Sequence, residues 1–362
     1  MNGIYEKRIA SLRSALIDKD AAFLIVNEVN IGYFTGFFHS EGALLVTEAS
    51  AFLLVDFRYH EAALKKSHAC EVVCFSRMGE ELIGLMQREG LSSLFFEPSA
   101  MTYSRASALS KKLGEEKIAL APSDKLDRAV EALRIIKDES ELQKIAKAQQ
   151  IAERAYLEVL NDLKPGVTER FISARLEYLM KLYGAEDISF SLITITGKKT
   201  SLPHGVPGDD EVREGDFFTF DFGAMYEGYH SDTTRTVAIG SASDEMREIY
   251  DIVLRAQLAA LEKIKAGESC SVIDKTARDI ITEAGFGKYF GHSTGHGVGL
   301  DIHEMPYVSS RSESVLRAGM VITDEPGIYL PDKFGVRIED MMAVTEDGCR
   351  NFVSLPKELI II

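Results

Sequence analysis

The chain is expected to fold as two domains, a smaller α/β domain followed by a larger α+β domain. Its 362 residues are more than one ordinary hydrophobic core organises. Short apolar runs alternate with helical segments through the first third of the chain, whereas pairs of helices precede strand-rich stretches in the rest. We place the boundary near residue 130, which gives domains 1–130 and 131–362.

The N-terminal domain is predicted to hold a sheet covered by helices. Its expected strands are apolar runs bounded by turn residues, at 21–27, 42–47, 51–57 and 91–98. Its expected helices have apolar residues at helical spacing, at 61–67, 80–90 and 103–114. Alternation of this kind is typical of an α/β sheet.

The second domain begins with a long helix over 137–163, for which Asp138 to Ser140 supply capping groups and which ends before Pro165. A second helix follows Thr168. The segments 191–197, 216–226 and 231–240 alternate apolar and polar residues, as antiparallel strands do.

Two further helices are predicted at 245–265 and 272–285, and Ser271 with Asp274 fits a capping box for the second one. Another strand-rich stretch runs from His296 onward. The order of helix, helix and strands therefore occurs twice, which predicts two similar halves.

Composition narrows the classes of function. A hydrophobic fraction of 46% and a charged fraction of 27% are ordinary for a soluble protein, and no apolar run approaches the roughly 20 residues that cross a bilayer. The net charge of -15 argues against nucleic acid as a partner, because phosphates require a basic surface. The polar N-terminal segment lacks the apolar centre of a signal peptide, so we expect a cytoplasmic protein.

Five residues in the last part of the chain have side chains that bind metals. They are Asp221, Asp232, His296, Glu325 and Glu339. Four carboxylates and one imidazole suit two adjacent divalent cations, because carboxylates can bridge the ions and neutralise their charge. Paired ions about 3.5–4 Å apart commonly activate water in hydrolases, so the set predicts a metal-dependent hydrolase.

Asp221 and Asp232 are expected on two neighbouring strands joined by a turn, so both carboxylates can face one point. Asp221 lies inside the apolar run FTFDFGA, where a charge is costly to bury unless it is paired or bound to metal. A buried ion pair or a role in the turn remains an alternative for each residue.

His296, His292 and His303 lie within twelve residues of one another, and the whole chain has eight histidines. Glycines flank it, which would permit an unusual backbone and the close approach of a substrate. A structural role is the alternative for one glycine-flanked histidine. The clustering of three beside acidic residues favours a functional site.

Glu325 lies where an apolar strand meets a Pro-Gly turn, and Glu339 lies in the strand-like segment GVRIEDM. The alternative for Glu339 is an exposed ladder of ion pairs with Arg337 and Asp340. Each residue is a weak indication alone, but their order and joint composition support one site.

At these residues the sequence resembles the creatinase/methionine aminopeptidase superfamily, and within it the branch of Xaa-Pro aminopeptidases and Xaa-Pro dipeptidases (prolidases). The resemblance covers nearly the whole chain. The stretches NIGYFTGF, GALLVT and LVDFRYHEAA are similar to the creatinase-type N-terminal domain, and RIIKDESELQKIAKA resembles the entry to the catalytic domain.

The resemblance implies a "pita-bread" catalytic domain, in which two pseudo-symmetric halves form an antiparallel sheet flanked by helices. It implies an exopeptidase that uses two divalent metal ions and hydrolyses the bond between an N-terminal residue and a following proline. Mn²⁺ is the favoured metal, with Co²⁺ or Zn²⁺ possible. Relatives are commonly homodimers, so a homodimer is expected.

The resemblance also assigns the metal ligands. Asp221 would bind one metal, His296 and Glu325 would bind the other, and Asp232 and Glu339 would bridge both.

Further site residues follow from the same resemblance. Glu325 would also accept the proton of the attacking water. His292 would line the proline side, and His303 would contact the substrate near the scissile carbonyl. His204 would bind substrate or shuttle protons, and Arg337 would reach the same pocket.

Two other functions remain open. One is a metal-free pita-bread protein that binds peptides or serves a structural role, and the other is a creatinase-like C–N hydrolase. The sequence departs from the usual pattern at Asp324, where an acidic residue precedes Glu325 and an apolar residue is common.

Overall fold

The computed structural model describes residues 2–15, 19–38 and 41–362. The chain divides into two compact units, Met1–Arg134 and Ile135–Ile362. The first is a mixed α/β unit, and the second has antiparallel sheets and helices, which confirms the predicted fold class. Among the described residues, none of the helices combines the length and apolar character needed to cross a membrane.

The first unit is built on one six-stranded sheet with the order β4-β3-β2-β1-β5-β6. Its strands are β1 (Ala21–Ile25), β2 (Ala43–Val46), β3 (Ala51–Val55), β4 (Glu71–Cys74), β5 (Ser93–Phe96) and β6 (Ala119–Pro122). Strand β2 runs antiparallel to β1 and β3, and the other neighbours are parallel. Parallel pairs need crossover connections, which here contain helices.

The helices of this unit are α1 (Asn2–Arg13), α2 (Glu28–Thr35), α3 (Phe57–Lys66), α4 (Met78–Arg88), α5 (Tyr103–Glu115) and α6 (Asp124–Arg134). Apolar residues from α4 and α5, such as Leu82, Met86 and Leu113, pack with Leu94 of the sheet in one core. Burying these side chains is the main favourable contribution to the folding of the unit.

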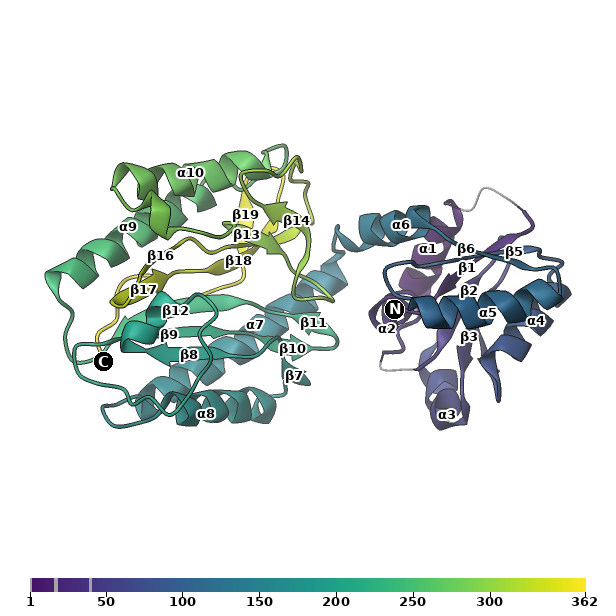
Figure 1. The fold of residues 1–362 in the computed structure, drawn as a ribbon, viewed down its shortest axis with the longest axis horizontal. Helices are drawn as coiled ribbons and strands as arrows, with labels where there is room; N and C mark the ends of the chain where they lie inside the picture. Colours follow the sequence, from purple (N-terminus) through teal and green to yellow (C-terminus); the bar gives the residue numbers. More distant parts are fainter. Residues whose placement is uncertain (1, 16–18, 39–40) are drawn as a thin grey trace. The chain divides into compact units, whose positions relative to one another are not determined.

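The second unit repeats one order of elements. Its first half has α7 (Glu139–Val159), η1 (Leu160–Asp162), α8 (Glu169–Leu182), β7 (Asp187–Ile188), β8 (Ile193–Thr196), η2 (Gly197–Ser201), β9 (Phe217–Phe222), β10 (Ala224–Tyr226), β11 (Tyr229–His230) and β12 (Thr233–Ala238). Its second half has α9 (Asp244–Leu261), α10 (Cys270–Glu283), η3 (Gly287–Tyr289), β13 (Gly295–Gly297), β14 (Glu304–Val308), β15 (Val321–Asp324), β16 (Gly327–Leu330), β17 (Phe334–Arg337), β18 (Asp340–Val344) and β19 (Cys349–Asn351). Figure 1 shows the strands of this unit between α8 and the pair of α9 and α10.

The sheets of this unit are antiparallel. Strands β12, β9 and β8 form one sheet, and β14, β13, β15, β18 and β19 form another. Helix α7 packs against β9 through Tyr156, whose ring stacks on Phe222 and meets Phe220 edge-on. Helices α9 and α10 share a core with residues of β15, β17 and β18. The strands are thereby fixed from both sides.

The helix boundaries follow local capping chemistry, with one exception. Asp138 caps α7, as predicted, and forms a capping box with Glu141; α8 follows Thr168, as predicted, and the Thr168 side chain caps it. The capping box predicted from Ser271 and Asp274 is wrong, because the residue that precedes α10 is Ser269. Asp274 instead accepts hydrogen bonds from Thr294 and pairs with Arg278.

Candidate metal centre and substrate cavity

All nine predicted site residues line one cavity of about 420 Å³ in the second unit. They are His204, Asp221, Asp232, His292, His296, His303, Glu325, Arg337 and Glu339. The segments that carry them are far apart in sequence and come from both halves of the unit. The remaining wall includes the apolar side chains of Phe190, Ile193, Pro203, Ile302 and Tyr307.

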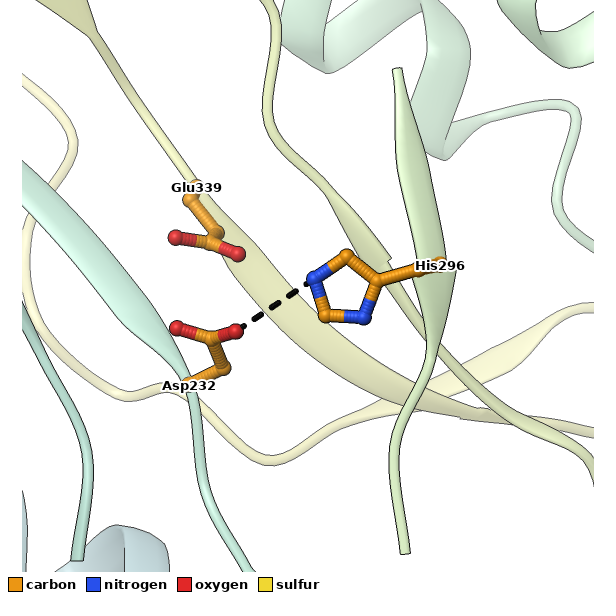
Figure 2. Close-up of side chains that lie close together, drawn as sticks. All are labelled: Asp232, His296 and Glu339. Carbon is orange, nitrogen blue, oxygen red and sulfur yellow. Dashed lines mark ion pairs between the residues drawn. The ribbon is translucent and has the colours of Figure 1, made fainter. Parts of the chain in front are cut away.

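Asp232, His296 and Glu339 form the tightest group. One nitrogen or oxygen atom from each lies within 4.8 Å of the others, and all three residues are buried. Figure 2 shows the three side chains pointing toward one another from separate segments. Asp232 immediately precedes β12, His296 is the middle residue of β13, and Glu339 lies between β17 and β18.

His296 presents a lone pair to two carboxylates. Its Nδ1 lies 3.0 Å from the Gly297 carbonyl oxygen, which only accepts hydrogen bonds, so Nδ1 carries the proton. Burial lowers the pKa of His296 to about 4, which keeps the ring neutral. Its Nε2 then faces Asp232 Oδ2 at 3.5 Å and Glu325 Oε1 at 3.6 Å. A cation between these acceptors would remove their mutual repulsion.

Two buried carboxylate oxygens in the cavity have no hydrogen-bond partner among the described residues. Arg337 Nη2 donates to Asp221 Oδ2 at 2.6 Å, whereas Asp221 Oδ1 has no hydrogen-bond partner among the described residues. The same holds for Asp232 Oδ1. Buried polar atoms are nearly always satisfied, so such oxygens indicate a ligand or an ion.

The electrostatics point the same way. Burial raises the pKa of Asp232 well above its ordinary value, and the charges of Asp221 and Glu325 raise it further. Glu339 behaves similarly, with burial as the main cause and Asp232 as the next. Burial also raises the pKa of Glu325 to about 8. Carboxylates that resist ionisation together are those that a divalent cation stabilises.

The residues present therefore fit divalent metal ions. Oxygen donors with one imidazole suit borderline and hard cations, and the three-residue group offers a preformed site. Asp221 and Glu325 lie in the same cavity beside that group. The alternative for Glu339, an exposed ladder of ion pairs with Arg337 and Asp340, does not occur, because all three residues are buried.

The glycines beside His296 have a role in strand packing that the sequence did not indicate. A Cβ added at Gly295 would lie 2.0 Å from the Thr323 carbonyl oxygen, and one at Gly297 would lie 2.3 Å from that of Met305. The two glycines therefore let β15 and β14 approach β13. They serve strand packing that fixes His296, and Gly295 also lines the cavity.

Tyr329 is a site residue that the sequence did not single out. Its hydroxyl accepts a hydrogen bond from Arg337 Nη1 at 2.9 Å and lies 2.9 Å from His292 Nε2. Because His292 Nδ1 faces the Ser293 carbonyl oxygen at 2.8 Å, Nδ1 holds the proton and Nε2 accepts from Tyr329. Nothing in the strand sequence GIYL distinguishes this tyrosine from a core aromatic residue.

The hydroxyl of Thr234 connects two of the predicted residues. It donates to Glu339 Oε2 at 2.7 Å and accepts from Arg337 Nε at 3.0 Å. Arg337 is therefore held by Thr234, Tyr329 and Asp221 together. A guanidinium fixed by three partners has a defined orientation, which it imposes on Asp221.

His303 and His204 lie at exposed positions on the wall of the cavity. The His303 ring packs edge-on against the His296 ring, with 4.4 Å between the ring centroids. His204 follows η2, beside Pro203, whose carbonyl oxygen accepts from Arg337 Nη1 at 3.4 Å. Both imidazoles can thus meet a substrate that enters the cavity.

The loop that carries His292 is held by α10. Arg278 donates to the carbonyl oxygens of Phe290 and His292, each at 2.8 to 2.9 Å. Asp274 accepts from Thr294, and the Thr294 carbonyl accepts from the Glu325 backbone N–H at 2.7 Å. The predicted proline side of the cavity therefore has rigid support.

Arg235 anchors the segment that carries Glu339. Its buried guanidinium donates to the Glu339 carbonyl at 2.6 Å and to Asp340 Oδ1 at 2.8 Å. It also donates to the carbonyl oxygens of Leu355 and Pro356, each at 2.9 Å. The metal-facing strands and the C-terminal segment are thus joined through one side chain.

Asp324 differs from its neighbour Glu325. Both of its carboxylate oxygens are buried, and neither has a hydrogen-bond partner in the part of the chain that the structure describes. Burial raises its pKa well above the usual range, and the charge of Asp340, its register partner on β18, adds to the effect. Glu325 lines the cavity, whereas Asp324 occupies a position suited to an apolar residue.

Comparisons with known proteins show which family the chain resembles. A model of metallopeptidase family M24 matches residues 143–346, and a model of the creatinase/prolidase N-terminal domain matches residues 8–136. An Xaa-Pro dipeptidase from Pyrococcus horikoshii is 41% identical over 361 residues, which cover 99% of each chain.

Two solved structures are also similar over nearly their whole length. An Xaa-Pro dipeptidase from Bacillus anthracis has a TM-score of 0.94 and 42% identity and covers 99% of this chain and 100% of its own. An X-Pro aminopeptidase from Thermotoga maritima has a TM-score of 0.91 and 38% identity, with coverage of 97% and 99%.

Proposed function

The chain belongs to metallopeptidase family M24, and we propose that it is a dinuclear metal exopeptidase that cleaves the bond between an N-terminal residue and a following proline. The main observation that supports this proposal is the cavity in which the His296 lone pair faces the carboxylates of Asp232 and Glu325. The similarity to Xaa-Pro dipeptidases over the full length supports the choice of peptide.

We assign the metal ligands as the resemblance implies. Asp221 would hold one ion, His296 and Glu325 would hold the other, and Asp232 and Glu339 would contact both. The chemistry supplied there when divalent cations are bound is activation of water and polarisation of the scissile carbonyl. Mn²⁺ is our first choice, with Co²⁺ and Zn²⁺ as the alternatives.

Glu325 is the proposed general base. Its buried carboxylate lies beside His296, where it can take a proton from the attacking water and pass it to the imino nitrogen of proline. The C–N bond then breaks and the proline nitrogen leaves as a secondary amine. Burial raises the pKa of the Glu325 carboxyl in the metal-free chain, and neighbouring cations would favour the ionised carboxylate, which is the form that accepts the proton.

His303 and His204 are the proposed donors to the oxygen that becomes negative during attack. Both are exposed on the cavity wall and can reach a bound peptide. Preorganised donors of this kind contribute on the order of 10²–10³ in rate each. His292 is the proposed wall of the proline pocket, with its ring fixed by Tyr329 and Ser293.

The experiment that tests the function uses three peptides. The protein is stripped with a chelator and assayed with Ala-Pro, Ala-Pro-Ala and Met-Ala-Ala after addition of Mn²⁺, Co²⁺ or Zn²⁺. We expect hydrolysis of the first two peptides, with about two metal ions bound per chain. Turnover of Met-Ala-Ala alone would exclude the Xaa-Pro assignment.

Metal analysis and an assay with creatine distinguish the proposed function from the two alternatives. A metal-free peptide-binding or structural protein would bind no stoichiometric metal, and a creatinase-like hydrolase would consume creatine. The ratio of rates on Ala-Pro and Ala-Pro-Ala decides between a dipeptidase and an aminopeptidase. A homodimer is expected from the resemblance, and light scattering of the purified protein checks it.

A further inference from the structure

An ion pair lies directly behind the His303 loop. Lys137 Nζ is 3.0 Å from Glu304 Oε2, and the side chains are 1% and 8% exposed. Lys137 also donates its backbone N–H to the Gly319 carbonyl at 2.8 Å, which fixes its place in the second unit. Ile302 and His303 line the cavity, whereas the carboxylate of the next residue points to Lys137.

Glu304 also organises the loop itself. Its Oε1 accepts a hydrogen bond from the Asp301 backbone N–H at 3.0 Å, so the side chain closes the segment 301–304 on itself. A Cβ added at Gly299 would lie 2.6 Å from Glu304 Oε2, so the preceding backbone packs against the same carboxylate. His303 therefore sits in a short loop whose shape depends on the position of one carboxylate.

The energetics make that position sensitive to Lys137. A buried carboxylate is stable in one place only while a partner charge and hydrogen bonds compensate for lost hydration. Removing the lysine takes away the positive charge 3.0 Å from Glu304 Oε2 and with it part of the compensation for burying that carboxylate, which favours its movement toward water. The Asp301 contact and the loop would move with it.

We propose that Lys137 is a positioning residue that holds His303, through Glu304, in the orientation needed to contact the substrate. The inference rests on the proposed function, which gives His303 that contact. The expected effect is on kcat, because a group displaced by about 1 Å can cost up to about 10²-fold in rate. Metal binding should stay unchanged.

A double-mutant cycle tests the proposal with Ala-Pro-Ala and Mn²⁺. Lys137→Met should lower kcat by about 10- to 100-fold in the wild-type background and by less than about twofold in a His303→Ala background. Lys137→Arg should restore most of the rate, because it keeps the charge. Equal losses in both backgrounds would overturn the proposal, because they would indicate a general structural defect.

Two matched variants serve as controls. Arg278→Met loosens the loop that carries His292, so its loss should be the same with and without His303. Lys144→Met removes a half-exposed lysine of α7, which pairs with Glu227 at 3.2 Å, and should leave kcat unchanged. If Lys137→Met does not fold, Glu304→Gln replaces it in the cycle, since the amide keeps an acceptor for Asp301.

Hydrogen exchange gives a readout independent of activity. In Lys137→Met the backbone amides of 298–308 should exchange at least about tenfold faster, and in Lys144→Met they should not change. If the wild-type protein hydrolysed no Xaa-Pro peptide, the proposed function would fail while this measurement still decided the positioning role. Unchanged exchange in Lys137→Met would overturn that role.

Discussion

Two buried carboxylates, one in each unit, have similar burial and different surroundings. Glu97 of the first unit is 0% exposed, and Asp232 of the second is 4% exposed. Glu97 accepts hydrogen bonds from the backbone N–H groups of Val26 and Asn27 and from Asn30 Nδ2, at 2.6 to 3.1 Å. Asp232 instead has one oxygen without a hydrogen-bond partner in the described structure and another facing His296.

The difference shows that burial alone does not mark a functional carboxylate. Burial raises the pKa of both groups, but three donors lower that of Glu97 again, whereas neighbouring acids raise that of Asp232 further. A satisfied carboxylate ties chain segments together. One that faces other acceptors is suited to hold a cation or a proton.

The largest effect on activity should come from substitution of Glu325, the proposed general base. Glu325→Gln removes the proposed proton acceptor and should lower kcat on the order of 10²–10⁴-fold without unfolding the protein. Steady-state kinetics with Ala-Pro-Ala and circular dichroism measure both. Glu97→Gln is the matched control and should retain kcat, and a Glu325→Gln rate within tenfold of wild type would remove Glu325 from its role.

For stability, in contrast to activity, the substitution in the first unit should have the larger effect. Glu97→Ala leaves three buried donors without their acceptor and should lower the free energy of unfolding by about 3 kcal/mol or more. Asp232→Ala, in metal-free protein, should change it by less than about 1 kcal/mol, because it removes a group that is costly to bury. Urea unfolding checks both, and a larger loss for Asp232→Ala would refute the comparison.

Asp324 sharpens the comparison, because its oxygens are unpartnered within the described residues although it is not among the predicted ligands. Asp324→Val should raise the free energy of unfolding by about 1–3 kcal/mol, since valine suits a buried strand. Its register partner supplies the control. Asp340→Val should destabilise the protein, because Asp340 pairs with Arg235 and Lys357. A thermal scan of both variants decides the matter.

The smallest effect concerns pH in metal-free protein. A carboxyl with a raised folded-state pKa holds a proton that the unfolded chain releases, so stability falls as pH rises toward about 8 for Glu325. His292 and His296, with pKa values lowered to about 4, act in the opposite direction only below the ordinary histidine pKa of 6.5.

The free energy of unfolding should therefore decline between pH 6.5 and 8, by about 1.5–2 kcal/mol for a carboxyl such as Glu325. Saturating Mn²⁺ should abolish the decline, because the metal replaces the proton. Thermal midpoints across this window measure the decline, and Glu325→Gln, which lacks the titrating carboxyl, should show a smaller one. A metal-free midpoint that rises with pH would contradict the assignment.

Local sequence predicted most of the fold. The apolar runs at 21–27, 42–47, 51–57 and 91–98 became β1, β2, β3 and β5, because they are buried and strongly apolar. The edge strands β4 and β6 were missed, since none of their residues is fully buried and their end residues are exposed. A short, half-exposed strand forms only because its neighbour offers free hydrogen-bonding groups.

The site was less predictable where its contacts are long-range. The nine cavity residues could be proposed from side-chain chemistry and resemblance, and their metal and catalytic roles stay predictions. Lys137 and Glu304 are 167 positions apart, and each is an ordinary charged residue in its own segment. Asp274 was mistaken for part of a capping box, because its hydrogen-bond partner Thr294 lies 20 positions away in the sequence.

Arg235 joins the strand beside Glu339 to the carbonyl oxygens of Leu355 and Pro356. Peeling away the final residues would leave its guanidinium without those acceptors and would disturb the backbone of Glu339. Occupancy of the cavity and resistance of the tail to digestion should consequently rise together. A carboxypeptidase time course could then report metal loading in a sample that has no chromophore for it.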